Sequence, residues 1–371
     1  MILGALQITL ANMPLFAQAI ANLNELLLQF IVAAVQGAAT LPFAHLVMTP
    51  PPFWTIGAYD GGLIAAAWLV RRGARTAACA LLIVASCGVI WPPRTADVRL
   101  KITVLDVGQA DAIVVQTPAG HAILIDAGGR LERGPQIAGG SMAERVGETI
   151  VAPCLIRFGV HHLDAIVLSH PHGDHAGGIA PVLRLLGADE FADSGQRYGG
   201  YAYKDALTVA HERNVPIISP RPGTTWHTSD GVSLSFLAPT LPFIAGSRND
   251  INNNSLVFML QYKSFRMLFT GDAGAEAEQR ILNEGVDLRA DVLKVGHHGS
   301  AYSSTPDFIS AVHPRYAIIS VGRHNLFGHP ASSTLETLQR FGARIYRTDQ
   351  NGAVMIATDG QDVELRQMLP N

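Results

Sequence analysis

The segment SHPHGDHAGG, residues 169–178, constrains the fold most strongly, because it places four metal-binding side chains within six residues. The preceding run DAIVL, residues 164–168, predicts a buried strand. Imidazole and carboxylate groups are ligands for zinc, iron and manganese, and the proline and glycines let the backbone turn sharply enough for the side chains to converge. One histidine is often structural, but an H-x-H-x-D-H spacing is hard to explain that way. We therefore expect a metal-binding loop built from His170, His172, Asp174 and His175.

Ligand-type residues also follow three other predicted strands directly. The strands are His121–Ile125, Arg266–Thr270 and Asp291–Val295, and the residues that follow them are Asp126, Asp272, His297 and His298. An aspartate after one strand is weak evidence, because Asp is also a common turn and helix-capping residue. Four such placements, one of them the H-x-H-x-D-H loop, indicate a sheet that carries all its active-site loops on one edge. We expect Gly271 to let the carboxylate of Asp272 come close to the histidine loop.

The rest of this part of the chain alternates between strand and helix patterns and predicts an α/β fold. Further strands are expected at Val98–Leu105, Ala112–Gln116, Val232–Leu237, Asn252–Tyr262, Tyr316–Ser320, Arg344–Tyr346 and Ala353–Ala357. Helices are expected at Glu144–Phe158, Pro181–Leu186, Asp205–Arg213, Glu276–Leu282 and Thr334–Phe341, with Asp205 as an N-cap.

Composition separates a different region at the N-terminal side. Only 15% of residues are charged, whereas soluble domains usually carry about 25%. Residues 1–99 hold 5 basic and 3 acidic residues and a single histidine of the 14, which leaves 22 basic and 27 acidic residues for the remainder. We therefore expect two domains, a membrane region at 1–96 and a histidine-rich catalytic domain at 97–371. The net charge of −3 excludes a strongly basic nucleic-acid clamp, and three cysteines exclude a disulfide framework.

The membrane region contains two clear candidate spans, Trp54–Val70 and Thr76–Trp91. The stretch Asn22–Val47 is apolar but interrupted by polar residues, so it is expected in the interface or in a helix bundle. Arg71, Arg72 and Arg75 lie between the two spans, and the positive-inside rule places this turn in the cytoplasm. Both far ends, and the catalytic domain, are then expected outside the cytoplasmic (inner) membrane. The alternative is a buried hairpin of a soluble protein.

Seven motifs follow one another between residue 98 and the end: LDVGQADA, LIDAGG, SHPHGDHAGG, NNNSLVFML, LFTGDAG, LKVGHHGS and NLFGHP. In this order they resemble the metallo-β-lactamase superfamily, and specifically the C-terminal domain of the ComEC family of competence proteins, which bring DNA through the cytoplasmic membrane. The resemblance implies an αββα sandwich with a metal site on one edge between two sheets. The apolar residues before it resemble the last helices of the membrane domain of that family.

The resemblance also implies a site with two divalent ions, zinc or manganese. Carried over to this sequence, His170 and His172 would bind the first ion, Asp174 and His175 the second, and Asp272 would bridge both. His297 or His298 would complete the second site, and the spacing does not choose between them. Asp126 would orient a ligand histidine, and Asp106, Gln109 and Asn254 are expected to support the ligands.

The chain departs from the superfamily pattern at one ligand. Many members have another histidine ligand between the loop cluster and the bridging aspartate. Here the candidates are His211 in a predicted helix and His227 in a predicted turn, neither of which follows a clear strand. We expect His211 at the surface, so that the first metal site is either incomplete or finished by Asn254 or His329. A complete family member would also carry more spans and a small β-barrel domain ahead of this sequence, so Met1 is interpreted as the start of a truncated or split gene or of a partial gene model.

The resemblance implies a membrane-tethered nuclease for DNA uptake, which would degrade one strand outside while the other passes inward. Two neighbouring divalent ions can activate a shared water and stabilise charge on a phosphoryl oxygen, and Asp174 is a candidate proton acceptor. His329 of the GHP motif is expected to approach the site, where a near-neutral pKa would suit a phosphate ligand or proton donor. Expected partners are DNA, as a single strand or an incoming duplex, further channel helices and DNA-receptor proteins.

Two alternatives remain open from the sequence. One is a hydrolase of the same superfamily that acts on a small ester or an envelope phosphodiester. The other is a non-enzymatic membrane protein with a decayed site. Residues 100–371 carry a net charge of −5, which argues against strong electrostatic capture of a polyanion. We therefore expect the metal ions or a separate receptor to hold the DNA.

Overall fold

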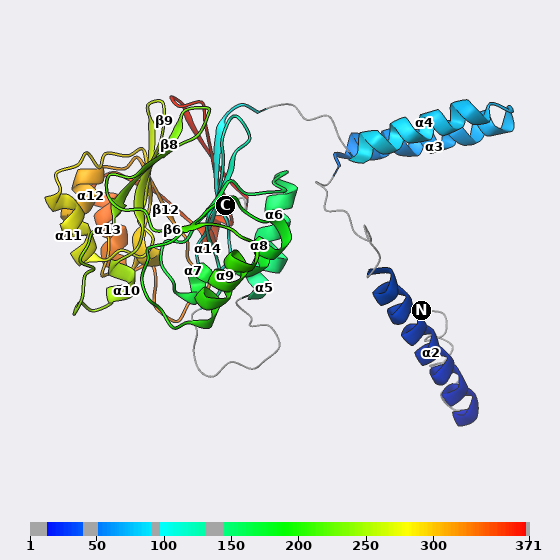
Figure 1. The fold of residues 1–371 in the computed structure, drawn as a ribbon, viewed down its shortest axis with the longest axis horizontal. Coiled ribbons are helices and arrows are strands. Elements are labelled where there is room, and N and C mark those ends of the chain that lie inside the picture. Colours follow the sequence, from blue (N-terminus) through cyan, green and yellow to red (C-terminus); the bar gives the residue numbers. More distant parts are fainter. Residues whose placement is uncertain (1–12, 40–50, 91–96, 131–143, 369–371) are drawn as a thin grey trace. The chain divides into compact units, whose positions relative to one another are not determined.

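The computed structural model describes residues 13–39, 51–90, 97–130 and 144–368. The chain divides into two compact units, residues 1–48 and residues 49–371. The first unit contributes one described helix, α2 (Pro14–Ala39). The second contains an apolar helical hairpin and a sandwich of two β-sheets covered by helices (Figure 1). The expected domain boundary after residue 96 adjoins residues 91–96, which lie outside the described residues, and it stays a prediction.

The first sheet of the sandwich has eight strands in the order β15-β14-β1-β2-β3-β4-β5-β6. Its strands from β15 to β3 pair antiparallel, and those from β3 to β6 pair parallel. The bounds are β1 Leu100–Val104, β2 Ala112–Gln116, β3 Ala122–Ala127, β4 Ala165–Val167, β5 Phe191–Ala192, β6 Ile217–Ile218, β14 Val354–Thr358 and β15 Val363–Gln367.

The second sheet has seven strands in the order β13-β12-β11-β10-β9-β8-β7. Strands β10 to β13 pair parallel, and β7 to β10 pair antiparallel. The bounds are β7 Thr225–His227, β8 Val232–Ala238, β9 Val257–Tyr262, β10 Phe265–Phe269, β11 Val292–Lys294, β12 Tyr316–Ile319 and β13 Arg344–Arg347.

Helices cover the outer face of each sheet, so the domain has four layers (Figure 1). The first sheet is covered by α5 Glu144–Val146, a π-helical turn Gly147–Val151, α6 Ala152–Arg157, α8 Ile179–Leu186 and α9 Tyr201–Glu212. The second sheet is covered by α11 Ala275–Asn283, α12 Pro306–Val312 and α13 Ser332–Arg340. Short helical turns are α7 Gly173–Ala176, α10 Asp250–Asn253, a 3-10 turn Gly296–Gly299 and α14 Thr348–Asn351. This arrangement confirms the expected αββα sandwich.

Three apolar layers hold the sandwich together. One lies between the sheets, where Phe258 and Phe269 stack with ring centroids 5.0 Å apart. The others lie between each sheet and its helices, with Phe191 in the first and Phe308 in the second. Since the sheets are covered on both faces, their central strands consist largely of continuous apolar runs. The loops at the strand ends are left to carry polar side chains.

Two expectations about local structure were wrong. The strand expected from Asn252 begins only at Val257, because the preceding asparagines hydrogen-bond to nearby backbone and form the turn α10. Helix α9 begins four residues before Asp205 with Gly200 as its N-cap, and Asp205 instead accepts a hydrogen bond from Arg184.

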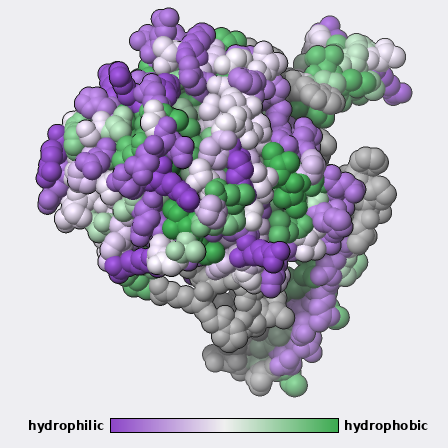
Figure 2. Space-filling view, turned by 60° about the vertical axis from the view of Figure 1, so that its left-hand side comes forward, coloured by the Kyte–Doolittle hydropathy of each residue, from purple (hydrophilic) through white to green (hydrophobic). Residues whose placement is uncertain are grey.

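The apolar hairpin consists of α3 (Phe53–Arg71) and α4 (Arg75–Ile90), joined by a tight basic turn. The helices approach closely at Gly62, where an added Cβ would lie 3.2 Å from the Cβ of Ala85, as small residues permit in membrane bundles. Large apolar side chains point outward, among them Phe53 and Ile64, and Figure 2 shows hydrophobic residues gathered on this hairpin.

Two described helices are long and apolar enough to cross a membrane, over Leu15–Ala38 and Phe53–Arg71. The third, α4, has 16 residues and is shorter than a typical span. The predicted stretch Asn22–Val47 corresponds to α2, although residues 40–47 lie outside the described ranges. The N-terminal helices therefore suggest membrane association.

Candidate metal centre

The four predicted ligand-bearing loops converge at one edge of the sandwich, as expected from the strand ends. Adjacent parallel strands β3 and β4 bring the loops of Asp126 and the histidine segment together, and β10 and β11 do the same for Asp272 and His298. Gly271 has a φ of +51°, and an added Cβ would lie 2.7 Å from the Cβ of Ser169. Only glycine allows this approach, which brings Asp272 against the histidine loop.

Three site residues adopt a backbone conformation that is uncommon for non-glycine residues. The φ angles are +53° for Asp126, +49° for His297 and +53° for His298. Such left-handed residues cost free energy and persist only where the surrounding structure fixes them. Two of them in succession aim the rings of His297 and His298 in different directions, with ring planes at 67° to each other.

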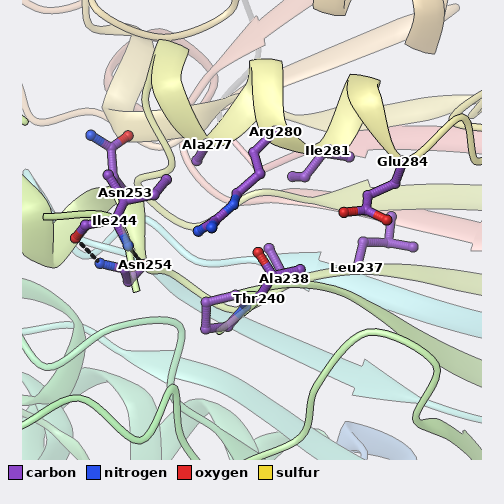
Figure 3. Close-up of a pocket in the computed structure, with 11 residues that line it drawn as sticks. Leu237, Ala238, Thr240, Ile244, Asn253, Asn254, Ala277, Arg280, Ile281 and Glu284 are labelled. Atoms are coloured by element: carbon purple, nitrogen blue, oxygen red, sulfur yellow. Dashed lines mark hydrogen bonds between the residues drawn. The ribbon is translucent and has the colours of Figure 1, made fainter. Parts of the chain in front are cut away.

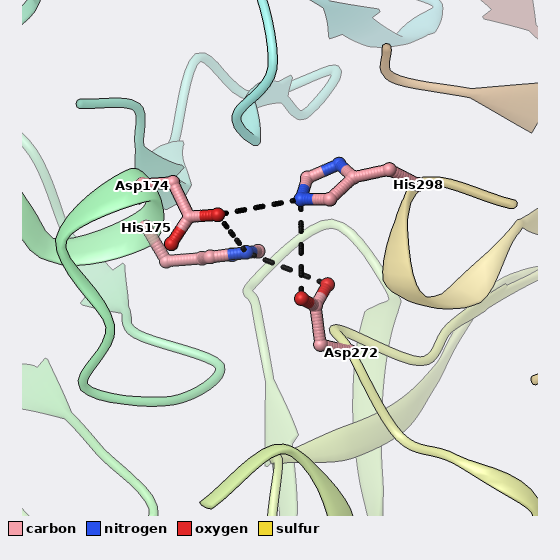
Figure 4. Close-up of side chains that lie close together, drawn as sticks. All are labelled: Asp174, His175, Asp272 and His298. Carbon is pink, nitrogen blue, oxygen red and sulfur yellow. Dashed lines mark ion pairs between the residues drawn. The ribbon is translucent and has the colours of Figure 1, made fainter. Parts of the chain in front are cut away.

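Four buried side chains form a tight cluster at the centre of this edge (Figure 4). His175 Nε2 lies 3.4 Å from Asp272 Oδ1, and His298 Nε2 lies 3.6 Å from Asp174 Oδ2. His298 Nε2 is also 3.9 Å from Asp272 Oδ2. Tetrahedral ligands about 2.1 Å from a zinc ion would lie about 3.4 Å from one another. The spacing therefore suits one metal ion.

Each residue of this cluster also has one buried side-chain atom that is left without a hydrogen-bond partner. Within the described part of the chain, Asp174 Oδ1, His175 Nε2, Asp272 Oδ1 and His298 Nε2 are buried and have no hydrogen-bond partner. Buried polar atoms are almost always paired, because an unpaired one carries a desolvation cost. The cluster thus offers two carboxylates and two imidazoles, and each of them has one atom without a hydrogen-bond partner. This is the donor set of a divalent-metal site. These residues therefore fit a metal ion.

A second group of histidines lies against the other side of Asp272. His170 Nε2 is 3.0 Å from His172 Nδ1 and 3.9 Å from Asp272 Oδ2. His297 Nε2 is 3.8 Å from the same oxygen, and its ring receives a contact from the amide of Asn252 at 3.2 Å. The carboxylate of Asp272 is thus shared between this group and the four-residue cluster.

Hydrogen bonds behind the cluster fix the orientation of two histidines. His175 Nδ1 lies 2.8 Å from Asp126 Oδ2, and His298 Nδ1 lies 3.0 Å from the carbonyl of Ser320. Both partners can only accept, so each Nδ1 donates and each Nε2 faces the cluster. Asp126 is held in turn by the backbone N–H and the hydroxyl of Ser169, each at 2.7 Å.

Electrostatics divides the site into neutral and charged groups. Burial lowers the pKa of His170 well below its ordinary value, and His175 lowers it further. Burial also acts to lower the pKa of His175, but the carboxylates of Asp272 and Asp126 outweigh it and raise that pKa. Burial acts to raise the pKa of Asp272, but His175 and His298 outweigh it and hold the pKa well below its ordinary value. Asp272 is therefore an anion, and His170 offers a free lone pair.

An ion pair behind the cluster was not anticipated from the sequence. Lys294 Nζ lies 2.7 Å from Asp111 Oδ2, and both side chains are almost completely buried. Asp111 Oδ1 in turn lies 3.8 Å from His298 Nδ1. Burial acts to raise the pKa of Asp111, but Lys294 and His298 outweigh it and lower the pKa. The sequence signal that could have indicated this ion pair was a single lysine within the apolar strand DVLKV.

The residues expected to support the ligands lie elsewhere. Asp106 is exposed, and Gln109 Oε1 accepts a hydrogen bond from the backbone N–H of Gly322 at 3.0 Å. The amide of Asn254 pairs with the backbone of Ile244, beside a small pocket under α11 (Figure 3). The asparagine that contacts the site is instead Asn252, which lies two positions earlier.

Of the three other histidines considered as site residues, two lie away from the metal centre and one lies close to it. His211 lies on α9 and His227 on β7, both exposed, so neither replaces the ligand that the superfamily pattern would place between loop cluster and Asp272. His329 approaches the site as predicted, with its ring centroid 5.7 Å from that of His297. Its expected near-neutral pKa was wrong, because burial and His297 lower the pKa to about 4.

Comparisons with known proteins agree with this architecture. The profile of the metallo-beta-lactamase superfamily matches residues 105–237. The chain is 32% identical to ComE operon protein 3 of Bacillus subtilis over 260 residues, 68% of this chain and 32% of that protein. It is 28% identical to competence protein ComA of Neisseria gonorrhoeae over 354 residues, 95% of this chain and 45% of that protein. The chain thus spans between a third and a half of the length of these relatives.

Among solved structures, the metallo-beta-lactamase fold protein YhfI of Bacillus subtilis aligns with 70% of this chain and 99% of its own. The sequence identity is 12% and the TM-score is 0.45.

Proposed function

Because the chain carries a metallo-β-lactamase domain and is homologous to competence proteins of the ComEC family, we propose that it is a metal-dependent nuclease that acts on DNA during uptake. The observation that carries this proposal is the set of four buried, unpartnered ligand atoms on Asp174, His175, Asp272 and His298. A decayed site would not keep such a convergent set from separate loops. The cluster therefore favours the enzyme over the non-enzymatic alternative.

We assign the ligands of two ions from these contacts. One ion would be held by Asp174, His175 and His298, and the other by His170, His172 and His297. Asp272 would bridge them, since its carboxylate lies within 4 Å of nitrogens from both groups. In this assignment both histidines of the VGHHGS motif are ligands, and His297 replaces the ligand missing between the loop cluster and Asp272.

Two bound divalent ions would activate a water molecule and stabilise charge on a phosphoryl oxygen. The protein would supply orientation and hydrogen bonds. Asp126 holds the ring of His175, and Ser320 holds the ring of His298, so that both Nε2 atoms point inward. His329 is neutral at physiological pH and keeps one ring N–H for a phosphoryl oxygen, whereas Asp174 remains the proposed proton acceptor.

We further propose that the nuclease domain acts on the outer face of the cytoplasmic membrane. The support is the basic turn between α3 and α4, where Arg71, Arg72 and Arg75 would remain cytoplasmic. As the homologous regions of the relatives are parts of longer proteins, further channel helices and a DNA receptor are proposed as partners.

The direct test uses the full chain in detergent micelles or nanodiscs with added manganese or zinc. We expect cleavage of a labelled single-stranded oligonucleotide that stops on chelation and returns with the metal. Replacement of Asp174 by Asn should abolish it, whereas His211→Ala, an exposed histidine outside the site, should not. Hydrolysis of small phosphodiesters with no DNA cleavage under any metal would instead support the small-ester hydrolase.

A further inference from the structure

A cavity of about 330 Å³ opens directly beside the cluster, and Asp272 and His297 form part of its wall. Its other walls include two aromatic side chains, Tyr302 and Phe327, together with Arg248. The cavity is therefore continuous with the proposed metal centre, and it presents flat rings and one cation to whatever is held there. The metal ligands and the activities described above do not account for these three side chains.

One wall of this groove is an arginine–tyrosine pair. The guanidinium carbon of Arg248 lies 3.7 Å from the ring centroid of Tyr302, whose side chain is 52% exposed. The backbone of Tyr302 is fixed, since its carbonyl accepts a hydrogen bond from Ala275 at the start of α11. A guanidinium over the face of an aromatic ring is a favourable contact that orders both side chains. Here it is held rigidly beside a candidate active site.

A second aromatic pair also lines this groove. The rings of Phe327 and His329 stack at 5.8 Å with their planes 17° apart. Asn325 fixes the loop that carries them: its amide donates to the carbonyls of Gly322 and His329 at 3.1 and 2.7 Å, and its Oδ1 accepts from the N–H groups of Phe327 and His329. The asparagine of the NLFGHP motif thus arranges both of its rings.

We propose that this groove binds one unpaired nucleobase of a single-stranded nucleic acid, next to the phosphodiester at the metal centre. The proposal rests on the nuclease function proposed above. A base offers a flat π-face for stacking on the Tyr302–Arg248 pair or on the Phe327–His329 pair, both of which line the groove, and stacking is a sequence-tolerant form of recognition. A base inside a duplex has both faces covered by its neighbours and does not fit without being extruded.

Recognition by stacking also accounts for the charge of the domain. Among the described side chains that line this groove, Arg248 is the one permanent cation, and Glu276, which accepts a hydrogen bond from Asn253 at 3.1 Å, adds an anion. Binding that depended on phosphate contacts would need many more cations. A groove that holds the base and leaves the backbone largely in solvent needs few. The affinity of the metal-free protein should therefore change little with salt.

The test measures binding without catalysis. The full chain in nanodiscs, in EDTA, is titrated into a single-stranded oligonucleotide that contains 2-aminopurine, whose fluorescence is quenched on stacking. We expect quenching, a plot of log K against log salt with a slope of about −0.7 for a single charge contact, and about 10-fold weaker binding for Tyr302→Ala. Tyr302→Phe retains the ring and should bind within about 2-fold of the unmodified protein. Leu326→Ala, which removes an exposed apolar neighbour without a ring, should have no effect.

Unchanged affinity for Tyr302→Ala, no 2-aminopurine quenching, or a steep salt slope would overturn the stacking site. The proposed nuclease function is judged separately, by cleavage with manganese or zinc. If 2-aminopurine is quenched and binding depends on the Tyr302 ring but no cleavage occurs, the base-binding groove is supported and the nuclease function is refuted. Cleavage that is unaffected by Tyr302→Ala, and equal for a normal and an abasic oligonucleotide, would leave the nuclease standing and refute the groove.

Discussion

The Nζ atom of Lys294 lies 2.7 Å from Oδ2 of Asp111, and this ion pair joins the two sheets beneath the candidate metal centre. Lys294 ends β11 of the seven-stranded sheet, and Asp111 precedes β2 of the eight-stranded sheet. The backbone carbonyl of Lys294 also accepts a hydrogen bond from the hydroxyl of Thr270 at 2.8 Å. This bond connects the ion pair to the strand that leads to Asp272. Both charges are buried, so each depends on the other for compensation.

Replacing Lys294 by Met should therefore destabilise the sandwich by about 3–5 kcal/mol, because it leaves the carboxylate of Asp111 buried and unpaired. The measurement is thermal unfolding of the full chain in nanodiscs. Lys204→Met, at an exposed position on α9, is the matched control and should change little. The double variant Lys294→Met/Asp111→Leu should regain much of the loss. Equal stability of the two lysine variants would contradict the structural role of the pair.

The sequence predicted this site well where an apolar strand pattern ends directly in a ligand-type residue. The strand ends predicted the positions of Asp126, Asp272 and the histidine loop, because a short apolar run that ends directly in a ligand-type residue is typical of a strand leading into an active-site loop. The convergence of these loops was also predictable, since adjacent parallel strands share an edge. The chemistry of the cluster needed no knowledge of the long-range contacts.

The remaining features depend on contacts that no local pattern records. Lys294 pairs with a residue 183 positions away, and the different directions of the His297 and His298 rings rest on two consecutive left-handed residues. Asn252 rather than Asn254 reaches the site because Asn254 is occupied by the backbone of Ile244. Such outcomes follow from the tertiary packing of loops, and residue spacing alone does not determine them.

Replacement of Asp272 by Ala should abolish metal binding and hydrolysis together, by at least about 100-fold in turnover, because one carboxylate faces both histidine groups. The fold should survive, since the residue lies in a loop at the sheet edge. Bound manganese or zinc, oligonucleotide cleavage and the unfolding temperature are measured on the same preparation. A turn-forming aspartate would behave differently: the variant would lose about 1 kcal/mol of stability and keep its metal and its turnover.

Glu278 should make the stability of the domain depend on pH. Burial raises its pKa from 4.5 to about 7. Hydrogen bonds that its carboxylate accepts from the backbone N–H groups of Ser304 and Thr305 lower the pKa, but burial outweighs them. The folded state therefore holds a proton that the unfolded chain releases near pH 4.5. This proton adds about 3 kcal/mol to the free energy of unfolding. The contribution is complete below about pH 4.5 and is lost as the pH rises through 7.

The Glu278→Gln variant should remove this dependence, because glutamine does not ionise. Between about pH 5 and 8 the unfolding temperature of the unmodified protein should fall by about 5–10 °C more than that of the variant. Glu284→Gln, at an exposed carboxylate after the same helix, should follow the unmodified protein. Parallel curves for Glu278→Gln and the unmodified protein would show that this carboxyl is not protonated in the folded state.

The basic turn between α3 and α4 should determine the orientation of the chain in the membrane. A reporter active only outside the cytoplasm, fused after residue 371, should be active, because Arg71, Arg72 and Arg75 keep the turn inside. Changing all three arginines to glutamine should reduce this activity and raise that of a cytoplasmic reporter at the same position. A fusion that is active only in the cytoplasm would reverse the proposed orientation.

The two neighbouring histidines of the VGHHGS motif should have separable effects on metal binding. His298 is buried and faces Asp174 and Asp272, so His298→Ala should empty the site that also contains His175. His297 faces Asp272 from the side of His170, so His297→Ala should lower the bound metal from two ions to one and leave the other site filled. Metal content per chain and the affinity of each site, measured by competition with a chromogenic chelator, distinguish the variants. If His297→Ala keeps two ions at unchanged affinity, His297 is not a ligand, and the first site is completed by another group.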